Sequence, residues 1–324
     1  MTQPTIGIII GDPAGIGPEV VVKALTQEKP EANMILVGSA EVVKMAIDLV
    51  KAPFDVHRIQ KLEDANFREG VLEVWDPGTL GPKDFELSKA SEACGKAVAL
   101  WLDMANTAAE EGRLQAVIMG PVNTDSLKMA HALEKIVSVE TGKTYLFLIT
   151  GPLRVVHLTD HIPLKQVVLE EVKKDKILKL IRLVDQSLKQ WGIPNPRIAM
   201  AGLNPHAYGE EEEKEIKPAI AEAGKEGIPV IGPVPPDSVF RQCIDRQYDI
   251  VIAHYHDQGH IAVKSWGFSG NCALILGTPF LSLSVAHGTA FDIAWQGKAD
   301  SAMMHSAICT AASLANGKGF PKEV

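Results

Sequence analysis

The stretch Thr5-Ile-Gly-Ile-Ile-Ile-Gly-Asp-Pro-Ala-Gly-Ile-Gly-Pro-Glu19, followed by VVVKAL, gives the first indication of the fold. The apolar run TIGIII predicts a buried strand, and the glycines after it predict a tight turn. VVVKAL predicts a helix with Pro18 in its first turn, where the missing N–H costs nothing. A strand that passes through a short turn into a helix is the repeating unit of α/β proteins.

Similar apolar runs recur along the chain and predict further strands: MILVG, VLEVW, QAVIMG, TYLFLIT, RVVHLT, RIAMAGL, YDIVIA, CALILG and FLSLSV. Apolar residues at helical spacing predict helices within 88–112 and 175–191. A chain of 324 residues suits two lobes or one large α/β unit. We expect two α/β lobes around a cleft, the first formed by residues 1–122 and 288–324 and the second by residues 123–287.

Composition excludes several classes of protein. No apolar run reaches the roughly 20 residues that a membrane span needs. The four cysteines lie far apart without a CxxC pair, which argues against a disulfide framework and against a thiolate zinc site. A net charge of -8 without a Lys/Arg-rich run argues against nucleic acid as a partner. The beginning of the sequence has no basic segment of the kind found in signal peptides, so we expect a cytoplasmic protein.

The glycine-rich segment 11–17 allows two interpretations. Glycines let the backbone approach a ligand closely, and the helix N-terminus behind them favours an anion. The spacing is not GxGxxG, however, and a tight strand-to-helix turn is the simpler interpretation. A phosphate-handling transferase has no support, because GxxxxGK[ST] is absent. The acidic run 210–213 is interpreted as a solvated first helical turn without a function.

Three of the ten histidines, His161, His206 and His256, lie in polar, turn-like segments just after predicted strands. The carboxyl ends of strands are where open α/β sheets place their sites. Imidazoles that converge there would leave open positions on a divalent cation for substrate oxygens. Each is also explained as a hydrogen-bonded structural histidine, and His157, His254 and His260 are alternative ligands. Asp160 and Asp257 either join the site or cap turns.

The segment Val285-Ala-His-Gly-Thr-Ala-Phe-Asp-Ile-Ala294 is predicted to open another helix. Backbone donors of His287, Gly288 and Thr289 would then face a cofactor phosphate or ribose, and Asp292 could accept a hydrogen bond from a ribose hydroxyl. An ordinary turn is the alternative. Lys264 lies eight residues after His256, either beside its site or as a surface lysine.

Taken together, these segments resemble the 4-hydroxythreonine-4-phosphate dehydrogenase family. The motifs that carry the resemblance are IGDPAGIGPE, GPVN at 120–123, HIPL at 161–164, GLNPHA at 202–207, GPVPPDSVF at 232–240, YHDQG at 255–259, Lys264 and HGTAFDIA at 287–294. They occur in family order over most of the chain. The resemblance implies a two-lobed α/β/α fold similar to isocitrate and isopropylmalate dehydrogenases, with the active site in the cleft of a homodimer.

The resemblance also implies a reaction and a set of site residues. His161, His206 and His256 match three metal-binding histidines, and His256 is expected to reach the partner subunit's metal. Family members oxidise a 3-hydroxy acid with NAD, after which the product loses carbon dioxide. The metal is zinc or another divalent ion such as cobalt, magnesium, manganese, nickel or iron. Further matching residues are Asp12, Asn204 and Lys264 for substrate, Lys264, Asp237 and Asp257 for proton transfer, and His287, Gly288, Thr289 and Asp292 for the cofactor.

Several positions depart from the family pattern for holding the substrate phosphate. The Gly-His-Thr-Glu segment after GPVN is absent, and Thr124 stands where the family has a lysine. Ala273 and Ser282 stand where the family has an asparagine and an arginine, and Trp295 replaces a small residue. Because charge-assisted bonds carry much of phosphate recognition, we expect an altered substrate tail. Lys143 and Arg154 are candidates for a replacement cation.

Two alternatives remain open beside the dehydrogenase of a 3-hydroxy acid. One is a cis-dihydrodiol carboxylate dehydrogenase of the same family, which the loss of phosphate contacts favours. The other is a non-catalytic homologue that binds metal or ligand without turnover, which the shortened loop and Trp295 favour. The substrate that reduces NAD distinguishes them.

Overall fold

The structure, a computed structural model, describes residues 3–27, 30–136, 139–267 and 270–321. No helix within these ranges is both long enough and apolar enough to cross a membrane.

The chain divides into two compact units. The first unit consists of residues 1–137 and 279–316, and the second of residues 138–278 and 317–324. The bounds predicted from the sequence are 122/123 and 287/288, with the last residues in the first lobe. Residues of this last segment lie in the second unit, because Gly319 donates its N–H to the carbonyl of Trp191 and Phe320 packs against Phe147.

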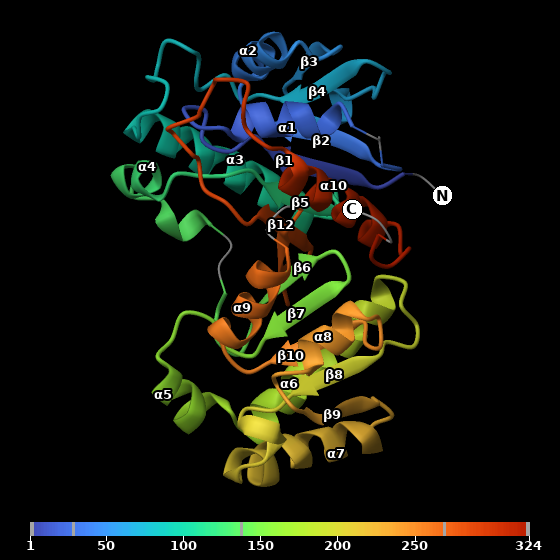
Figure 1. The fold of residues 1–324 in the computed structure, drawn as a ribbon. Helices are drawn as coiled ribbons and strands as arrows, with labels where there is room; N and C mark the ends of the chain where they lie inside the picture. The colour runs from blue at the N-terminus through green and yellow to red at the C-terminus, as the bar shows by residue number, and fades with distance from the viewer. Residues whose placement is uncertain (1–2, 28–29, 137–138, 268–269, 322–324) are drawn as a thin grey trace. The chain divides into compact units, whose positions relative to one another are not determined.

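The first unit contains a parallel sheet in the order β3-β4-β2-β1-β5-β12. Figure 1 shows α1 and α10 on one face and α3 on the other. The strands are β1 Thr5–Ile9, β2 Asn33–Val37, β3 Asp55–Ile59, β4 Val71–Trp75, β5 Ala116–Met119 and β12 Leu281–Val285. The helices are α1 Gly17–Leu25, α2 Ala40–Val50, η1 Leu62–Asp64, α3 Glu92–Glu110, α4 Thr124–Met129, η2 Leu133–Lys135 and α10 Ala302–Ala315.

The second unit contains a mixed sheet in the order β11-β6-β7-β10-β8-β9. Strand β6 pairs antiparallel with β11 and β7, and the remaining pairs are parallel. The strands are β6 Tyr145–Thr150, β7 Leu153–His157, β8 Ile198–Ala201, β9 Val230–Val234, β10 Ile250–Ala253 and β11 Cys272–Leu276. The helices are α5 Leu164–Gln166, η3 Val167–Glu171, α6 Lys174–Gln190, η4 Pro205–Ala207, η5 Glu212–Ile216, α7 Lys217–Lys225, α8 Val239–Ile244 and α9 His256–Trp266.

Every strand predicted from an apolar run is present, and both predicted helices form, as α3 and α6. The side chain of Ser91 accepts a hydrogen bond from Cys94 N–H and caps the N-terminus of α3. Pro18 lies in the first turn of α1, as predicted. Two strands, β3 and β9, were not predicted. Both lie at sheet edges, where polar residues and Pro233 interrupt the apolar pattern.

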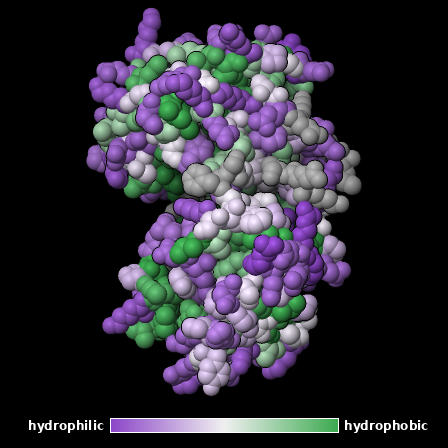
Figure 2. All heavy atoms as spheres, in the orientation of Figure 1, coloured by the Kyte–Doolittle hydropathy of each residue, from purple (hydrophilic) through white to green (hydrophobic). Residues whose placement is uncertain are grey.

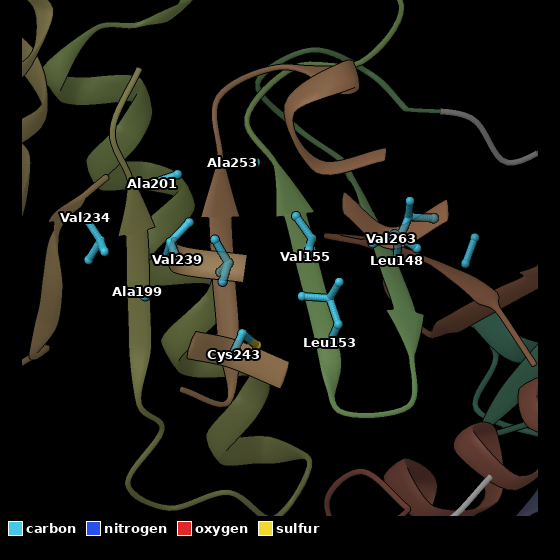
Figure 3. Packing of buried hydrophobic residues seen from close by; sticks show 12 residues of the cluster. Leu148, Leu153, Val155, Ala199, Ala201, Val234, Val239, Cys243, Ala253 and Val263 are labelled. Carbon is cyan, nitrogen blue, oxygen red and sulfur yellow. The ribbon is translucent and has the colours of Figure 1, made fainter. Parts of the chain in front are cut away.

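One hydrophobic cluster of the second unit lies between its sheet and helices α8 and α9. Figure 3 shows Leu153 and Val155 of β7, Val239 and Cys243 of α8, and Val263 of α9 directed into one cluster. All four residues of β10 are buried, as is typical of a parallel strand covered on both faces. The central strands are therefore rigid supports for the loops at their ends.

Candidate active site

Three adjacent parallel strands of the second unit carry the three candidate histidines. His161 follows the end of β7 by four residues, His256 follows β10 by three, and His206 follows β8 by five. Strand β10 lies between β7 and β8, and all three run in the same direction. The carboxyl ends of these strands therefore bring the three loops to one edge of the sheet, where α/β proteins place their sites.

Two of these histidines form a possible metal site together with an aspartate. Ligand atoms of Asp160, His161 and His256 all lie within 4.8 Å of one another. The His161 side chain is 79% exposed and that of Asp160 only 16% exposed. Asp160 Oδ1 is buried and has no hydrogen-bond partner within the described ranges. A buried carboxylate oxygen without a donor is costly, and a cation beside it would remove that cost.

His256 is oriented by its neighbours on α9. Its Nδ1 lies 2.7 Å from Asp257 Oδ1, and its ring stacks on His260 at a centroid distance of 3.6 Å. The hydrogen bond lowers the pKa of Asp257, so this carboxylate stays ionised and fixes the Nδ1–H tautomer. The Nε2 atom of His256 is then the one available to a metal.

Two of the alternative histidines have structural roles. His254 is fully buried, and its Nε2–H donates to the carbonyl of Ala201 at 2.8 Å. The Nδ1–H of His157 donates to the carbonyl of Leu146 at 3.1 Å. Burial lowers the pKa of His157 to about 3 and that of His254 to about 4, so both rings are neutral. These two rings fix the ends of β7 and β10 rather than extend into the loops.

Gly259 permits the close approach of α9 to His157. A Cβ at Gly259 would lie 2.2 Å from His157 Nε2 and 2.7 Å from Val155 Cγ1. We expect Gly259→Ala to displace the helix that carries His256 and to destabilise the protein by about 1–3 kcal/mol. Gly224→Ala is the matched control, because a Cβ there meets nothing within 4 Å. Thermal unfolding of both variants tests this, and equal midpoints would show that α9 adjusts freely.

The loop that carries His206 is held by a buried glutamate. Glu212 Oε1 accepts hydrogen bonds from the N–H groups of Leu203 and Asn204, each at 2.8 Å, and Oε2 accepts one from Asn204 Nδ2 at 2.7 Å. Burial raises the pKa of Glu212, but these hydrogen bonds outweigh it and hold the pKa below its ordinary value. The prediction that the acidic run 210–213 is a solvated turn is wrong at Glu212, which is 0% exposed.

Within the described ranges, the group of possible metal-ligand atoms contains Asp160 and does not include His206. His206 and Ala207 have φ values of 57° and 55°, in the left-handed region that is costly for residues with a Cβ. Gln258 connects the neighbouring strand ends, because its side chain accepts from His254 N–H at 2.8 Å and donates to the Gly202 carbonyl at 2.7 Å. This part of the edge is thus tightly held.

The other predicted residues of the second unit lie on nearby elements. Lys264 is exposed on α9, two turns after His256, and its charge helps to lower the pKa of His260, after burial and the charge of His256. Asp237 is exposed in the turn before α8. The Asn204 amide donates to both Glu211 and Glu212, so at least its nitrogen is used within the loop.

In the first unit, the chain itself occupies the space that the glycines of segment 11–17 create. A Cβ at Gly11 would lie 2.4 Å from the Pro121 carbonyl oxygen, and one at Gly17 would lie 2.3 Å from that of Ile10. Asp12 is fully buried; its Oδ1 accepts from Ala14 N–H and its Oδ2 from Ser126 Oγ, both at 2.9 Å. These contacts favour the tight-turn interpretation of the segment.

The segment 287–292 packs onto this glycine turn. Ile16 N–H donates to the Thr289 carbonyl at 3.0 Å, and Trp295 Nε1–H donates to the Pro13 carbonyl at 2.9 Å. The predicted helix is wrong here, because residues 286–297 form bends and turns in which Ala290 and Trp295 have positive φ values.

The predicted cofactor residues of this segment differ in exposure. Thr289 is buried, whereas Gly288 and Asp292 are exposed. His287 Nδ1–H donates to the Gly288 carbonyl at 2.9 Å, and its buried Nε2 has no partner within the described ranges.

Lys143 and Arg154 are the two candidates for a cation that replaces the lost phosphate contacts. Lys143 pairs with Glu140 on the surface, and Arg154 lies at the amino end of β7, away from the end that precedes His161. Ala273 and Ser282 are buried within β11 and β12 and place no charge there.

The sequence is similar to a known protein family over most of its length. The family model described as pyridoxal phosphate biosynthetic protein PdxA matches residues 30–311. A relative from Novosphingobium aromaticivorans, provisionally named 4-hydroxythreonine-4-phosphate dehydrogenase, is 48% identical over 98% of this chain and 97% of its own length. The D-threonate 4-phosphate dehydrogenase of Salmonella typhimurium is 36% identical over 97% of this chain and 100% of its own length.

Solved structures show the same relationship. The 4-hydroxythreonine-4-phosphate dehydrogenase of Klebsiella pneumoniae matches with a TM-score of 0.84 and 34% identity over 97% of this chain and 98% of its own. The terephthalate 1,2-cis-dihydrodiol dehydrogenase of Burkholderia xenovorans matches at 0.72 and 28% identity, over 96% and 98%. A β-decarboxylating dehydrogenase of Thermococcus kodakarensis, at 0.51 and 16% identity over 96% and 83%, shares the fold. The chain therefore belongs to the pyridoxal phosphate biosynthetic protein PdxA family, and its named relatives are dehydrogenases.

Proposed function

We propose that this protein is a metal-dependent, NAD-linked dehydrogenase that oxidises a 3-hydroxy acid, with subsequent decarboxylation. The observation that carries the proposal is the group Asp160, His161 and His256 at the carboxyl edge of the second unit's sheet. It supplies two imidazoles and one buried carboxylate oxygen without a donor. The dehydrogenase names of the relatives support the reaction class.

The donor set of this group fits a divalent cation. Imidazole and carboxylate ligands suit zinc, and also cobalt, nickel, iron or manganese, while magnesium would use the oxygen ligands alone. When bound, such an ion acidifies the substrate hydroxyl and polarises its carboxylate, which assists hydride transfer to NAD and the later loss of carbon dioxide. Three protein ligands leave coordination positions for substrate, and His206 is proposed as a further ligand on the neighbouring loop.

We assign proton transfer to Lys264 or Asp237 and a positioning role to Asp257. The Oδ1 atom of Asp257 is already engaged with His256 Nδ1, so this carboxylate acts through the imidazole. Lys264 and Asp237 are exposed on elements that adjoin the same sheet edge, where a side chain can exchange a proton with water. Asp12 and Asn204, matched to substrate contacts by the family motifs, remain proposals of the same kind.

For the cofactor we propose the segment 287–292 of the first unit. His287 Nδ1–H is used internally, so the unpartnered Nε2 is an acceptor for a ribose hydroxyl. The exposed carboxylate of Asp292 is a second acceptor, and the backbone of Gly288 and Thr289 offers contacts to phosphate. This proposal rests on acceptors and turn backbone, since the helix N-terminus predicted here is absent.

The substrate tail distinguishes two candidate activities. Ala273 and Ser282 remove an amide and a guanidinium that the family pattern has, which favours a substrate without phosphate. The likeness to a terephthalate cis-dihydrodiol dehydrogenase makes a dihydrodiol carboxylate the second candidate.

NADH formation with three substrates decides between the candidates: 4-phosphohydroxythreonine, its dephosphorylated analogue and an aromatic cis-dihydrodiol carboxylate. We expect the phosphate to bring little gain in kcat/KM over the dephosphorylated analogue, because the lost bidentate bond removes at least about 1.4 kcal/mol, or about tenfold, of the preference that it would give. A clear preference in kcat/KM for 4-phosphohydroxythreonine over its dephosphorylated analogue would contradict the proposal that the substrate lacks a phosphate. Metal binding without any NADH supports the non-catalytic homologue.

We further propose a homodimer whose active site lies at the subunit interface. Apolar side chains are exposed beside the metal group: Leu164 and Leu169 are 53% and 60% exposed, and Ile261 on α9 is 66% exposed. Figure 2 shows apolar atoms at the surface over the α5 and η3 segment. Exposed apolar patches next to a site are typical of surfaces that a partner covers.

A further inference from the structure

A second pocket of the second unit lies at the opposite edge of the sheet from the metal group. It has a volume of about 310 Å³ and is lined by the beginnings of β7, β8 and β10, the turn after α6 and residues 318–321. Arg154 is the second residue of β7, and Arg197 and Asp249 directly precede β8 and β10. Figure 3 shows Leu153 at the amino end of β7 and Ala253 at the carboxyl end of β10. A strand of this length spans about 16 Å, so the pocket and the metal group are separate.

The charges around this pocket are mostly positive, although the whole chain carries a net charge of -8. Arg154, Arg197, Arg246 and Lys318 line it, and Asp249 is the acidic residue among the lining residues. Arg197 already neutralises Asp249, through Nη2 to Oδ1 at 2.7 Å and Nε to Oδ2 at 3.2 Å. Asp249 also acts on Arg154 through its charge, but within the described ranges it forms an ion pair with Arg197 alone, and Arg154 and Arg246 remain as cations of the lining beside it. Such a concave cationic site attracts a small anion.

Arg154 has hydrogen-bond donors to offer. Its guanidinium carbon lies 4.4 Å from the centre of the Phe320 ring, so the aromatic ring covers one face of the guanidinium. The N–H groups point outward in the guanidinium plane and are not used by such stacking. Its Nε is buried and has no hydrogen-bond partner among the described residues. Burial, the largest cause, lowers the pKa of Arg154, and the neighbouring charge of Asp249 offsets this only in part.

The remaining walls of the pocket are flat and apolar. Ile193, Pro194 and Pro321 contribute aliphatic surface, and Tyr248 and Phe320 contribute aromatic rings. Phe320 is itself fixed by edge contacts to Phe147 and Trp191, with ring centres 5.7 and 6.2 Å apart. The pocket thus combines planar cationic donors with a preformed apolar surface, which is the usual composition of a small-molecule site.

We propose that this pocket binds a small ligand that carries a phosphate or carboxylate group on a flat apolar body. Arg154 and Arg246 bind the anionic group, and the rings of Phe320 and Tyr248 contact the body. The structural alternative is that Arg154 only fastens the segment 318–321 through its stacking on Phe320. Binding of an anion distinguishes the two, because stacking alone creates no affinity for a ligand.

The test uses the full chain with the metal removed by a chelator, so that probes cannot bind at the metal group. Calorimetric titrations are made with phenyl phosphate, benzoate, inorganic phosphate and phenol. We expect the two aromatic anions to bind, phosphate to bind more weakly and phenol not to bind. Arg154→Met and Arg246→Gln are each expected to raise the dissociation constant for the better aromatic anion by about tenfold or more, while Lys179→Met, an exposed cation of α6, leaves it unchanged.

Each other outcome overturns part or all of the proposal. No binding of any anion by wild type, or equal binding by wild type and Arg246→Gln, excludes the pocket as the site. Equal affinity for phosphate and phenyl phosphate would show that the pocket does not bind the apolar body of the ligand. Because Arg246 is exposed, its variant should fold even if Arg154→Met does not, and thermal unfolding checks this. Loss of binding in His161→Ala would place the anion at the metal group instead.

Discussion

His256→Ala should lose its bound divalent metal and reduce the rate of NAD reduction by about a thousandfold or more. Of the group Asp160, His161 and His256, this change leaves only the buried oxygen of Asp160 and the His161 ring to hold the ion, beside the proposed ligand His206. A bound metal contributes several kcal/mol to stabilising the transition state, and each 1.36 kcal/mol is a factor of ten in rate. Elemental analysis of the purified variant and its rate of NADH formation are the measurements.

The same loss is expected in His161→Ala, whose exposed side chain makes an indirect effect through folding small. His57→Gln is the matched control, because His57 lies on β3 of the first unit and glutamine can still donate to Glu73. Asp257→Asn should weaken metal binding by about 10- to 100-fold without abolishing it. Replacing a residue that is hydrogen-bonded to a metal-bound histidine usually has an effect of this size. Full metal content in both alanine variants would mean that the ion binds elsewhere.

Glu212→Ala should destabilise the protein by about 2–4 kcal/mol and impair turnover as well. It leaves the N–H groups of Leu203 and Asn204 without their acceptor in a partly buried loop, and each unsatisfied group costs about 1–3 kcal/mol. The left-handed conformations of His206 and Ala207 would then lose their support. Thermal unfolding and kcat/KM, measured with saturating metal, test the two effects.

Glu213→Gln is the control for this variant, since Glu213 is exposed and its partner is the surface residue Lys217. A surface ion pair contributes about 0–1 kcal/mol, so this neighbour should behave as wild type. If Glu212→Ala instead unfolds at the wild-type temperature with unchanged kcat/KM, the loop that carries His206 does not depend on the buried carboxylate.

The sequence predicted the interior of the fold better than its edges. The strands β1 and β10 are almost entirely buried and read as apolar runs, which sequence patterns reveal. The edge strands β3 and β9 are half exposed, and β9 contains Gly232 and Pro233, so their sequences resemble loops. The predicted helix after β12 failed because contacts of Trp295 with the glycine turn, remote in sequence, decide the conformation.

For the site, position after a strand end was the informative signal. It singled out His161 and His256, whose ligand atoms lie within 4.8 Å of each other and of Asp160, and it left open whether Asp160 joins the site or caps a turn. The role of Glu212 could not be predicted, because a run of four glutamates is normally solvated and only tertiary contacts bury one of them. Arg154, a candidate for the replacement cation, lies at the amino end of β7, remote from the end that precedes His161.

The central claim, a metal-dependent dehydrogenase, is tested most directly by adding zinc back to chelator-treated protein and following NADH with the best substrate of the panel. We predict that the metal-free protein is inactive, that activity returns as about one ion per chain binds, and that His161→Ala shows no recovery. Undiminished NADH formation by the metal-free protein, or full recovery in His161→Ala, would contradict the proposed metal site.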